Sequence, residues 1–149
     1  MKMSKDGPDA PPEGFALFTG RGDAENVLGP YYWCMQGDRR AMGFRVKSHH
    51  LNRNRVCHGG IIAAFADAQS AILKIGTDLE GFVTPTINLT VDYIAPARQG
   101  NWVESDPVLV KSTTRLLFIT ANIMVDGGII ARMNGIHKIT STVVPKNPG

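Results

Sequence analysis

The residues best suited to chemistry lie in one stretch, in which a polar loop leads into an apolar segment. The loop contains Asn52 and ends at His58, and the pair Gly59 and Gly60 follows it. Beyond the glycines the chain is apolar on nearly every side, with one carboxylate, Asp67, in the middle. Aspartate is unfavourable inside a helix and is rarely buried without a partner, so its place in this segment requires an explanation.

Two interpretations of this carboxylate are open. In the first, Asp67 lies on a narrow solvated stripe with Ser70 and Lys74, which follow it at helical spacing. In the second, Asp67 acts together with the two glycines, which would lie in the first turn of a helix. Unpaired backbone N–H groups point outward there, and without a side chain an anion or a developing oxyanion can approach them closely. The helix would then carry two functional groups, which we call its two poles: the N–H groups of the glycine end, which attract negative charge, and the carboxylate of Asp67.

The spacing of these two poles predicts how they would cooperate. Gly59 and Asp67 are eight residues apart, which corresponds to roughly 12 Å along a helix axis. One carbonyl group cannot contact both. If they act on the same carbonyl, a second copy of the helix must run antiparallel beside the first, as a two-fold dimer would place it. The spacing therefore predicts a composite site, with the glycine end from one subunit and the aspartate from the other.

One long buried helix and several strands must position these residues. The apolar run predicts a helix of about 27 Å over residues 58–75, which Gly76 terminates. A short helix is predicted near residues 14–18. Strands are predicted at residues 31–35, 41–48, 86–94, 102–110, 115–125 and 129–140, with turns at 36–39 and 126–128 and an edge or bulge at Pro107. A flat sheet could not cover the long helix, so the prediction is an α+β fold with a curled antiparallel β-sheet wrapped around one long central helix.

Composition limits the class of protein. The 149 residues, 43% of them hydrophobic, suffice for one domain with a real core. We expect a flexible arm at residues 1–12, a single domain at 13–144 and a tail at 145–149. The net charge of +3 suits a phosphorylated small ligand and is too diffuse to indicate nucleic acid. No run resembles a signal peptide or a membrane span, so the prediction is a cytoplasmic protein without membrane contact.

Cysteine and histidine patterns indicate no metal site. Cys34 and Cys57 have no metal-ligand spacing, which favours free thiols in a reducing compartment. His49 and His50 fall in a loop, and His137 is predicted to face the core from a strand. We therefore expect neither a metal nor a bound organic cofactor.

The arrangement resembles the hotdog-fold acyl-CoA thioesterases, of the phenylacetate-pathway and 4-hydroxybenzoyl-CoA type. The resemblance covers about residues 28–139 and rests on the spacing of its motifs. These are Asn52, then after five residues His58-Gly59-Gly60, then after six residues Asp67, and a later strand that ends in Pro96-Ala97-x-x-Gly100.

The resemblance implies a role for each matching position. Asp67 would be the catalytic carboxylate, either as general base for water or as nucleophile. The backbone N–H of Gly59 would polarise the thioester carbonyl from the helix N-terminus. Asn52 would orient the water or the thioester. Thr86, at the start of the strand after the helix, matches a position at which such enzymes often carry Ser or Thr near the attacking water.

The other candidates adjoin this motif. His58 could be a general base, but its place favours capping or steadying the helix start. Gly60 shares the turn that would face an anion. Arg53 and Arg55 make the loop more basic than in the family, which often has Gly where this chain has Arg55. The two arginines either bind the phosphates of coenzyme A or only decorate the surface.

Two expectations concern the surroundings of the site. Strand alternation places Thr86 on the opposite face from Ile87, Leu89 and Val91, so it reaches a site only if that outer face borders the dimer interface. An apolar or aromatic acyl group is expected from three candidate pocket residues, Phe65, Phe82 and Met35.

The prediction is an acyl-CoA thioesterase that hydrolyses an acyl thioester to a free acid and CoA at a site shared between two subunits. It would form a homodimer, paired again into a dimer of dimers, with acyl-CoA as its substrate. One alternative is a hotdog enoyl-thioester hydratase or dehydratase, although those usually show a different arrangement of His and acid. The other is a non-catalytic module that binds acyl-CoA, although binding alone would need no carboxylate near the thioester.

Overall fold

The computed structural model describes residues 9–19 and 22–143. Its strands are β1 (Ala16–Leu17), β2 (Tyr32–Gln36), β3 (Arg39–Arg45), β4 (Thr86–Tyr93), β5 (Trp102–Ser105), β6 (Val108–Ser112), β7 (Leu116–Val125) and β8 (Gly128–Lys138). Its helices are α1 (Asp23–Leu28), α2 (Gly59–Asp67) and α3 (Ser70–Leu73), with a single 3₁₀ turn, η1 (Ser48–His50).

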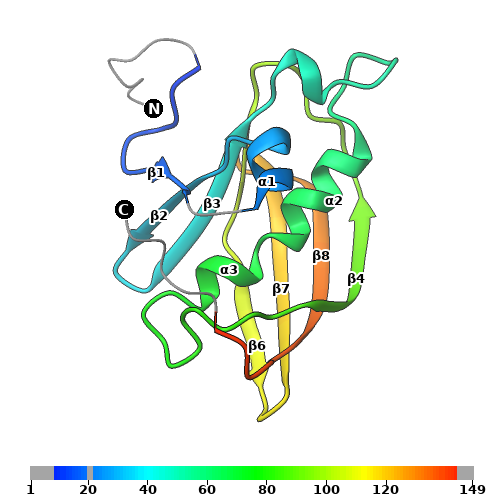
Figure 1. The fold of residues 1–149 in the computed structure, drawn as a ribbon. Helices are drawn as coiled ribbons and strands as arrows, with labels where there is room; N and C mark the ends of the chain where they lie inside the picture. The colour runs from blue at the N-terminus through cyan, green and yellow to red at the C-terminus, as the bar shows by residue number, and fades with distance from the viewer. Residues whose placement is uncertain (1–8, 20–21, 144–149) are drawn as a thin grey trace.

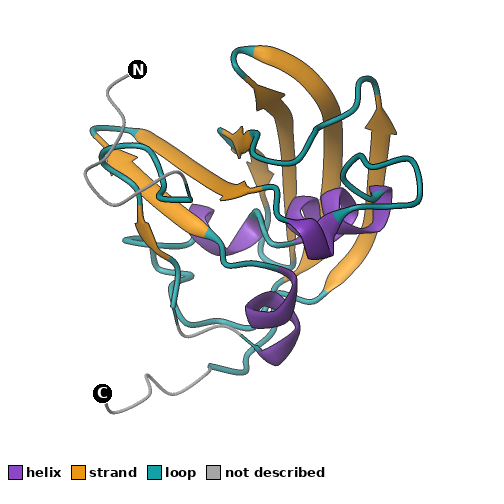
Figure 2. Ribbon diagram, turned by 90° about the horizontal axis from the view of Figure 1, so that it is seen from above, coloured by secondary structure: helices purple, strands orange, loops and turns teal. Residues whose placement is uncertain are grey.

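The strands form one antiparallel sheet that curls around the helices. Neighbouring strands follow the order β1-β2-β3-β5-β7-β8-β4, and β6 pairs with β7 beside this path. Figure 1 shows α2 and α3 lying across one face of the sheet, and Figure 2 shows strands curving around them. The predicted α+β architecture is confirmed. The strand β4 forms one end of the path, so its outer edge has no pairing strand in the described chain.

The long central helix is present as predicted, with a tightened turn at residues 68–69 that separates α2 from α3. There the backbone N–H of Gln69 donates to the carbonyl of Ala66, one residue nearer than the α-helical partner. The carbonyl of Phe65 accepts instead from the side-chain Nε2 of Gln69, at 2.8 Å. Gly76, with a φ of +73°, follows as the predicted stop.

The two predicted tight turns are also confirmed. In the first hairpin Gln36 pairs with Arg39, which leaves a two-residue loop between β2 and β3. In the second, Val125 pairs with Gly128. The residues between them, Asp126 and Gly127, both have positive φ, as a two-residue hairpin turn of this type requires.

Two predicted elements were wrong, and in both cases the actual structure depends on pairing with strands that are distant in sequence. The short helix near residues 14–18 is the strand β1, because Ala16 pairs with Trp33 of β2; the helix α1 begins only after Gly22. The single strand at residues 102–110 is two strands. The chain breaks at Asp106 and Pro107, since β5 joins β3 to β7 and β6 pairs with β7 alone.

The predicted arm and tail fall largely outside the described residues, which omit 1–8 and 144–149. Within the arm, the carbonyl of Ala10 accepts a hydrogen bond from Arg45 Nη2 at 2.7 Å. In the part of the chain that the structure describes, no helix has the length and apolar character needed to cross a membrane.

An aromatic cluster fixes α2 against the sheet. The ring of Phe65, from the middle of α2, lies 5.0 Å from that of Phe44 on β3 and 5.5 Å from that of Tyr31. All three side chains are buried, as is Ile62 one turn earlier. Close packing of these rings orients the helix, and thereby the residues on its opposite side.

Candidate active site

The loop before α2 is anchored by a buried histidine. Nε2 of His50 donates to the carbonyl of Leu28, at the end of α1, and its Nδ1 accepts from the N–H of Lys47. The carbonyl of His50 accepts from the N–H of His58 at 2.8 Å. One residue therefore ties together the end of α1, the loop and the start of α2. This arrangement requires a neutral imidazole, because Nδ1 accepts a hydrogen bond.

The side-chain oxygen of Asn52 holds the loop in its conformation. Its Oδ1 accepts from the N–H groups of Asn54, at 2.9 Å, and Val56, at 3.3 Å. Among the described residues its Nδ2 has no acceptor, so that N–H group is available to a ligand. Arg55, with a φ of +61°, makes the turn of this loop, and like Arg53 its side chain is exposed.

The start of α2 presents one open N–H group. Nδ1 of His58 accepts from the N–H of Gly60 at 2.8 Å and caps the helix, which is the role the sequence favoured. The Gly60 N–H is thereby occupied, whereas the Gly59 N–H has no acceptor in the described chain. Tyr93 of β4 donates to the carbonyl of Gly59 at 2.8 Å. A side chain on Gly59 would lie only 3.3 Å from the Tyr93 ring.

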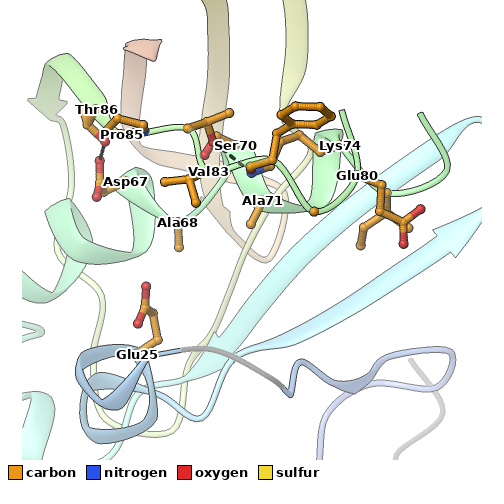
Figure 3. Close-up of a pocket in the computed structure, with 14 residues that line it drawn as sticks. Glu25, Asp67, Ala68, Ser70, Ala71, Lys74, Glu80, Val83, Pro85 and Thr86 are labelled. Carbon is orange, nitrogen blue, oxygen red and sulfur yellow. Dashed lines mark hydrogen bonds between the residues drawn. The ribbon is translucent and has the colours of Figure 1, made fainter. Parts of the chain in front are cut away.

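At the other end of α2, Asp67 opens onto a cleft of about 540 Å³. Figure 3 shows its carboxylate on the cleft wall, joined to Thr86. Thr86 Oγ1 donates to Asp67 Oδ1 at 2.6 Å. Ser70 and Lys74, which the sequence places on one stripe with Asp67, line the same cleft. The stripe therefore faces a cavity, as a candidate active-site carboxylate should.

Strand alternation was wrong about the orientation of Thr86. The register between β4 and β8 shifts between Thr86 and Asn88, which is the signature of a β-bulge. A bulge inserts one residue and reverses which side chains face inward. Thr86 therefore turns toward α2, and it reaches Asp67 within one chain.

Behind Thr86 lies His137, which is fully buried as predicted. Its Nδ1 is 3.3 Å from Thr86 Oγ1. Because the only proton of the Thr86 hydroxyl is donated to Asp67, His137 must donate here, from a neutral ring protonated on Nδ1. Burial lowers the pKa of His137, and the negative charge of Asp67, which acts to raise this pKa, offsets only part of the lowering. Its Nε2 is buried and has no partner among the described residues.

The aromatic pocket that was predicted is only partly present. Phe82 lines the cleft. Phe65 is instead in the core, and Met35 is an exposed residue of β2. The cleft is lined by polar and apolar residues in equal measure, and Phe82 is its one aromatic residue among the described residues.

Three residues of the site were missed. Tyr93 holds Gly59, His137 supports Thr86, and Glu25 of α1 lines the cleft opposite Asp67. Each comes from an element distant in sequence. Only the strand order and the packing of α1 bring them to the site, so no local motif could identify them.

The two buried histidines predict a loss of stability in acid. Burial lowers the pKa of both His50 and His137 from the ordinary value of 6.5. Near and below pH 6.5 the unfolded chain therefore binds more protons than the folded protein. The free energy of unfolding is therefore expected to be highest above pH 6.5 and to fall as the pH drops below it. Urea unfolding at a series of pH values measures this. His137→Asn should reduce the slope, whereas substitution of the exposed His49 by Gln should reduce it less, because His49 acts only through its charge, which adds to the lowering of the His50 pKa. An equal slope in His137→Asn would contradict the assignment.

A curled antiparallel sheet around a central helix, with a carboxylate and an open helix N-terminus on that helix, defines a hotdog-fold protein. The family model of the thioesterase superfamily matches residues 54–131, and the chain belongs to this family.

Individual relatives are distant in sequence. The chain is 25% identical over 130 residues to the Pseudomonas aeruginosa protein named putative esterase PA0474, covering 86% of this chain and 96% of that one. Zebrafish thioesterase superfamily member 2 has a TM-score of 0.72 at 18% identity, over 81% of this chain and 89% of that one. The PaaI protein of E. coli, from the phenylacetic acid degradation operon, has a TM-score of 0.71 at 16% identity, over 82% and 87%. A hypothetical thioesterase of Streptococcus pneumoniae TIGR4, solved with coenzyme A, has a TM-score of 0.67 at 16% identity, over 76% and 91%. These likenesses identify the hotdog fold.

Proposed function

We propose that the protein is an acyl-CoA thioesterase, which hydrolyses an acyl thioester to a free acid and CoA. The observation that carries the proposal is the carboxylate of Asp67, which opens onto a cleft and accepts a hydrogen bond from Thr86. On the same helix Gly59 keeps an N–H group without an acceptor in the described chain. A base and an oxyanion donor are the two parts that hydrolysis of a thioester needs. The family to which the chain belongs supports the same reaction.

In the proposed mechanism Asp67 takes a proton from water as the water oxygen attacks the thioester carbon. Charge then develops on the carbonyl oxygen, where the Gly59 N–H and Asn52 Nδ2 donate to it. The C–S bond breaks, and the proton held by Asp67 passes to the leaving thiolate. Thr86 occupies one oxygen of Asp67, which leaves the other oxygen for the water. This favours the general-base role over direct attack by the carboxylate.

The site of this mechanism is shared between two subunits. Because α2 is regular from Gly59 to Asp67, the two poles lie roughly 12 Å apart along its axis. A second copy that pairs with the free outer edge of β4 would bring a second α2 alongside in antiparallel orientation. Exposed apolar side chains on and just after β4, at Ile87, Tyr93 and Ile94, suit such an interface. Two such dimers would pair into the predicted dimer of dimers.

Coenzyme A would lie against the basic loop. Arg53 and Arg55 are exposed there, and the bridge between Val56 and Arg98 brings a third exposed arginine to the same end of the molecule. Arginine binds phosphate through paired N–H groups, which suits the phosphates of the coenzyme A part of the substrate. The Streptococcus pneumoniae neighbour solved with coenzyme A supports a site for this moiety in the fold.

Thr86 is expected to contribute through its hydroxyl. Thr86→Val should lower kcat about tenfold, because a hydrogen bond to a charged group is lost. Thr86→Ser keeps the hydroxyl and should stay near wild type. Thr90→Val is the matched control, since Thr90 lies on the same strand and, among the described residues, its side chain bonds only Asn88. Steady-state thiol release measures all four proteins. A kcat in Thr86→Val equal to that of Thr90→Val would contradict the role.

The reaction itself is tested by following thiol release from a panel of acyl-CoAs with a thiol reagent. The panel covers short, medium and long chains together with phenylacetyl-CoA and hydroxybenzoyl-CoA. Release from at least one of them is the expected result. Binding of acyl-CoA without release from any member would replace the proposal with that of a non-catalytic binding module.

A further inference from the structure

The cleft beside Asp67 carries an excess of negative charge. Among its described lining residues are three carboxylates, those of Asp67, Glu25 and Glu80, and one ammonium group, that of Lys74. The ammonium group is engaged by the wall itself, because Nζ of Lys74 donates to the carbonyl of Phe82 and to Thr84 Oγ1. This contrasts with the arginine-rich loop at the other end of α2. The molecule is thus basic where the phosphates of CoA would lie and acidic along the adjoining cleft.

Glu25 differs from the other two carboxylates of the cleft. Asp67 accepts from Thr86, and Glu80 accepts from the N–H of Gly76 at 2.9 Å. The Glu25 carboxylate has neither a hydrogen bond nor an ion pair with any described residue. Figure 3 shows it extending from α1 into the cleft, on the side opposite Asp67. The side chain is half-buried, so part of its hydration is lost without replacement.

Among the described residues that line the cavity behind Glu25, none carries a positive charge. A second cavity, of about 340 Å³, adjoins it on that side, and its other described lining residues are uncharged. One of them is Tyr31, whose buried hydroxyl has no partner in the described chain. Burial raises the pKa of Tyr31, and the charge of Glu25 raises it further, so the phenol stays neutral. Within the part of the chain that the structure describes, the wall that Glu25 forms is therefore electronegative, and no cation of the second cavity offsets its charge.

We infer that Glu25 is a specificity-determining residue of the acyl pocket, which favours an acyl group that ends in a hydroxyl over one that ends in a carboxylate. The inference rests on the proposed function, in which the acyl carbon lies at Asp67, and it places the rest of the acyl group along the cleft that Asp67 and Glu25 both line. A terminal hydroxyl would donate to the unpaired carboxylate in a charge-assisted hydrogen bond. A terminal carboxylate would be repelled by Glu25, with Asp67 adding to the repulsion. A plain alkyl end would leave Glu25 unpaired.

The test compares three six-carbon substrates that differ only at the far end: hexanoyl-CoA, 6-hydroxyhexanoyl-CoA and adipyl-CoA. Thiol release gives kcat/KM for each with the wild type, with Glu25→Gln and with Asp23→Asn. The last variant is the control, because it removes a carboxylate from the same helix that does not line the cleft. Circular dichroism and thermal unfolding confirm that each variant is folded.

In the wild type we expect 6-hydroxyhexanoyl-CoA to be preferred over adipyl-CoA. Glu25→Gln should reduce this preference about tenfold, chiefly through faster hydrolysis of adipyl-CoA, because the charge is removed while the shape is kept. Asp23→Asn should leave it unchanged. Added salt should weaken the preference in the wild type and not in Glu25→Gln.

Two outcomes overturn the inference in different ways. In the first, hexanoyl-CoA is hydrolysed in a reaction that depends on Asp67, and wild type and Glu25→Gln show the same preference for the hydroxyl over the carboxylate substrate. This result would show that Glu25 does not determine specificity, and it would leave the thioesterase proposal intact. Absence of thiol release from all three substrates and from the wider panel would overturn the thioesterase proposal and this inference together.

Discussion

The Asp67→Asn variant is expected to lose about 10³-fold in kcat for thioester hydrolysis, with little change in KM. Asparagine has the size of aspartate and still offers Oδ1 to the Thr86 hydroxyl, so the hydrogen bond in the cleft is retained. It cannot take a proton from water, which is the step assigned to the carboxylate. The loss should therefore fall on the chemical step and spare substrate binding. Thiol release under steady-state conditions measures both parameters.

A matched control separates this effect from a general loss of charge. Asp38 lies in the exposed turn between β2 and β3, and Asp38→Asn should retain wild-type kcat. A single turnover in oxygen-18 water then distinguishes the two roles of Asp67. With water as nucleophile the acid product carries the label at once. Attack by the carboxylate would first form an anhydride with Asp67, and water that opens it at the aspartyl carbon would leave the label on Asp67 and release unlabelled acid in the first turnover. An unchanged kcat in Asp67→Asn would remove this residue from the mechanism.

The elements that depend on local sequence were predictable. The apolar run made the central helix evident, and Gly76 and the glycine-containing turn at residues 126–127 marked where elements end. The distance between Gly59 and Asp67 followed from the same local rule, because a regular helix has a fixed rise per residue. For this reason the two poles of the site could be placed before the sheet was known.

The parts that depend on pairing between distant strands were not predictable. Thr86 was assigned to the wrong face because the bulge that turns it arises from its register against β8. His137 contacts Thr86 through that same register. The strand β1 exists only because β2 lies beside it. Glu25 reaches the cleft through the packing of α1, whose end is held by the buried His50. None of these contacts leaves a periodic pattern in the residues concerned.

A mixture of two inactive variants is expected to regain activity if the site is shared between subunits. The first variant, Asp67→Asn, lacks the base. The second, Asn52→Asp, keeps the oxygen that shapes the loop and loses the Nδ2 donor, which should lower kcat about 10²-fold. In a mixed dimer one site combines Asn52 of the first variant with Asp67 of the second, and is intact. The other site carries both substitutions.

Random pairing of the two variants should restore about a quarter of the wild-type activity, because half of the dimers are mixed and each mixed dimer has one intact site. The proteins are produced together with two different affinity tags, and the mixed dimer is purified through both. Measured alone, the mixed dimer should reach about half of the wild-type kcat per dimer. Two wild-type chains that carry the same tags are the control for assembly. Activity no higher than the mean of the two parent variants would place Asn52 and Asp67 in one subunit's site, and would contradict the antiparallel pairing of two α2 helices.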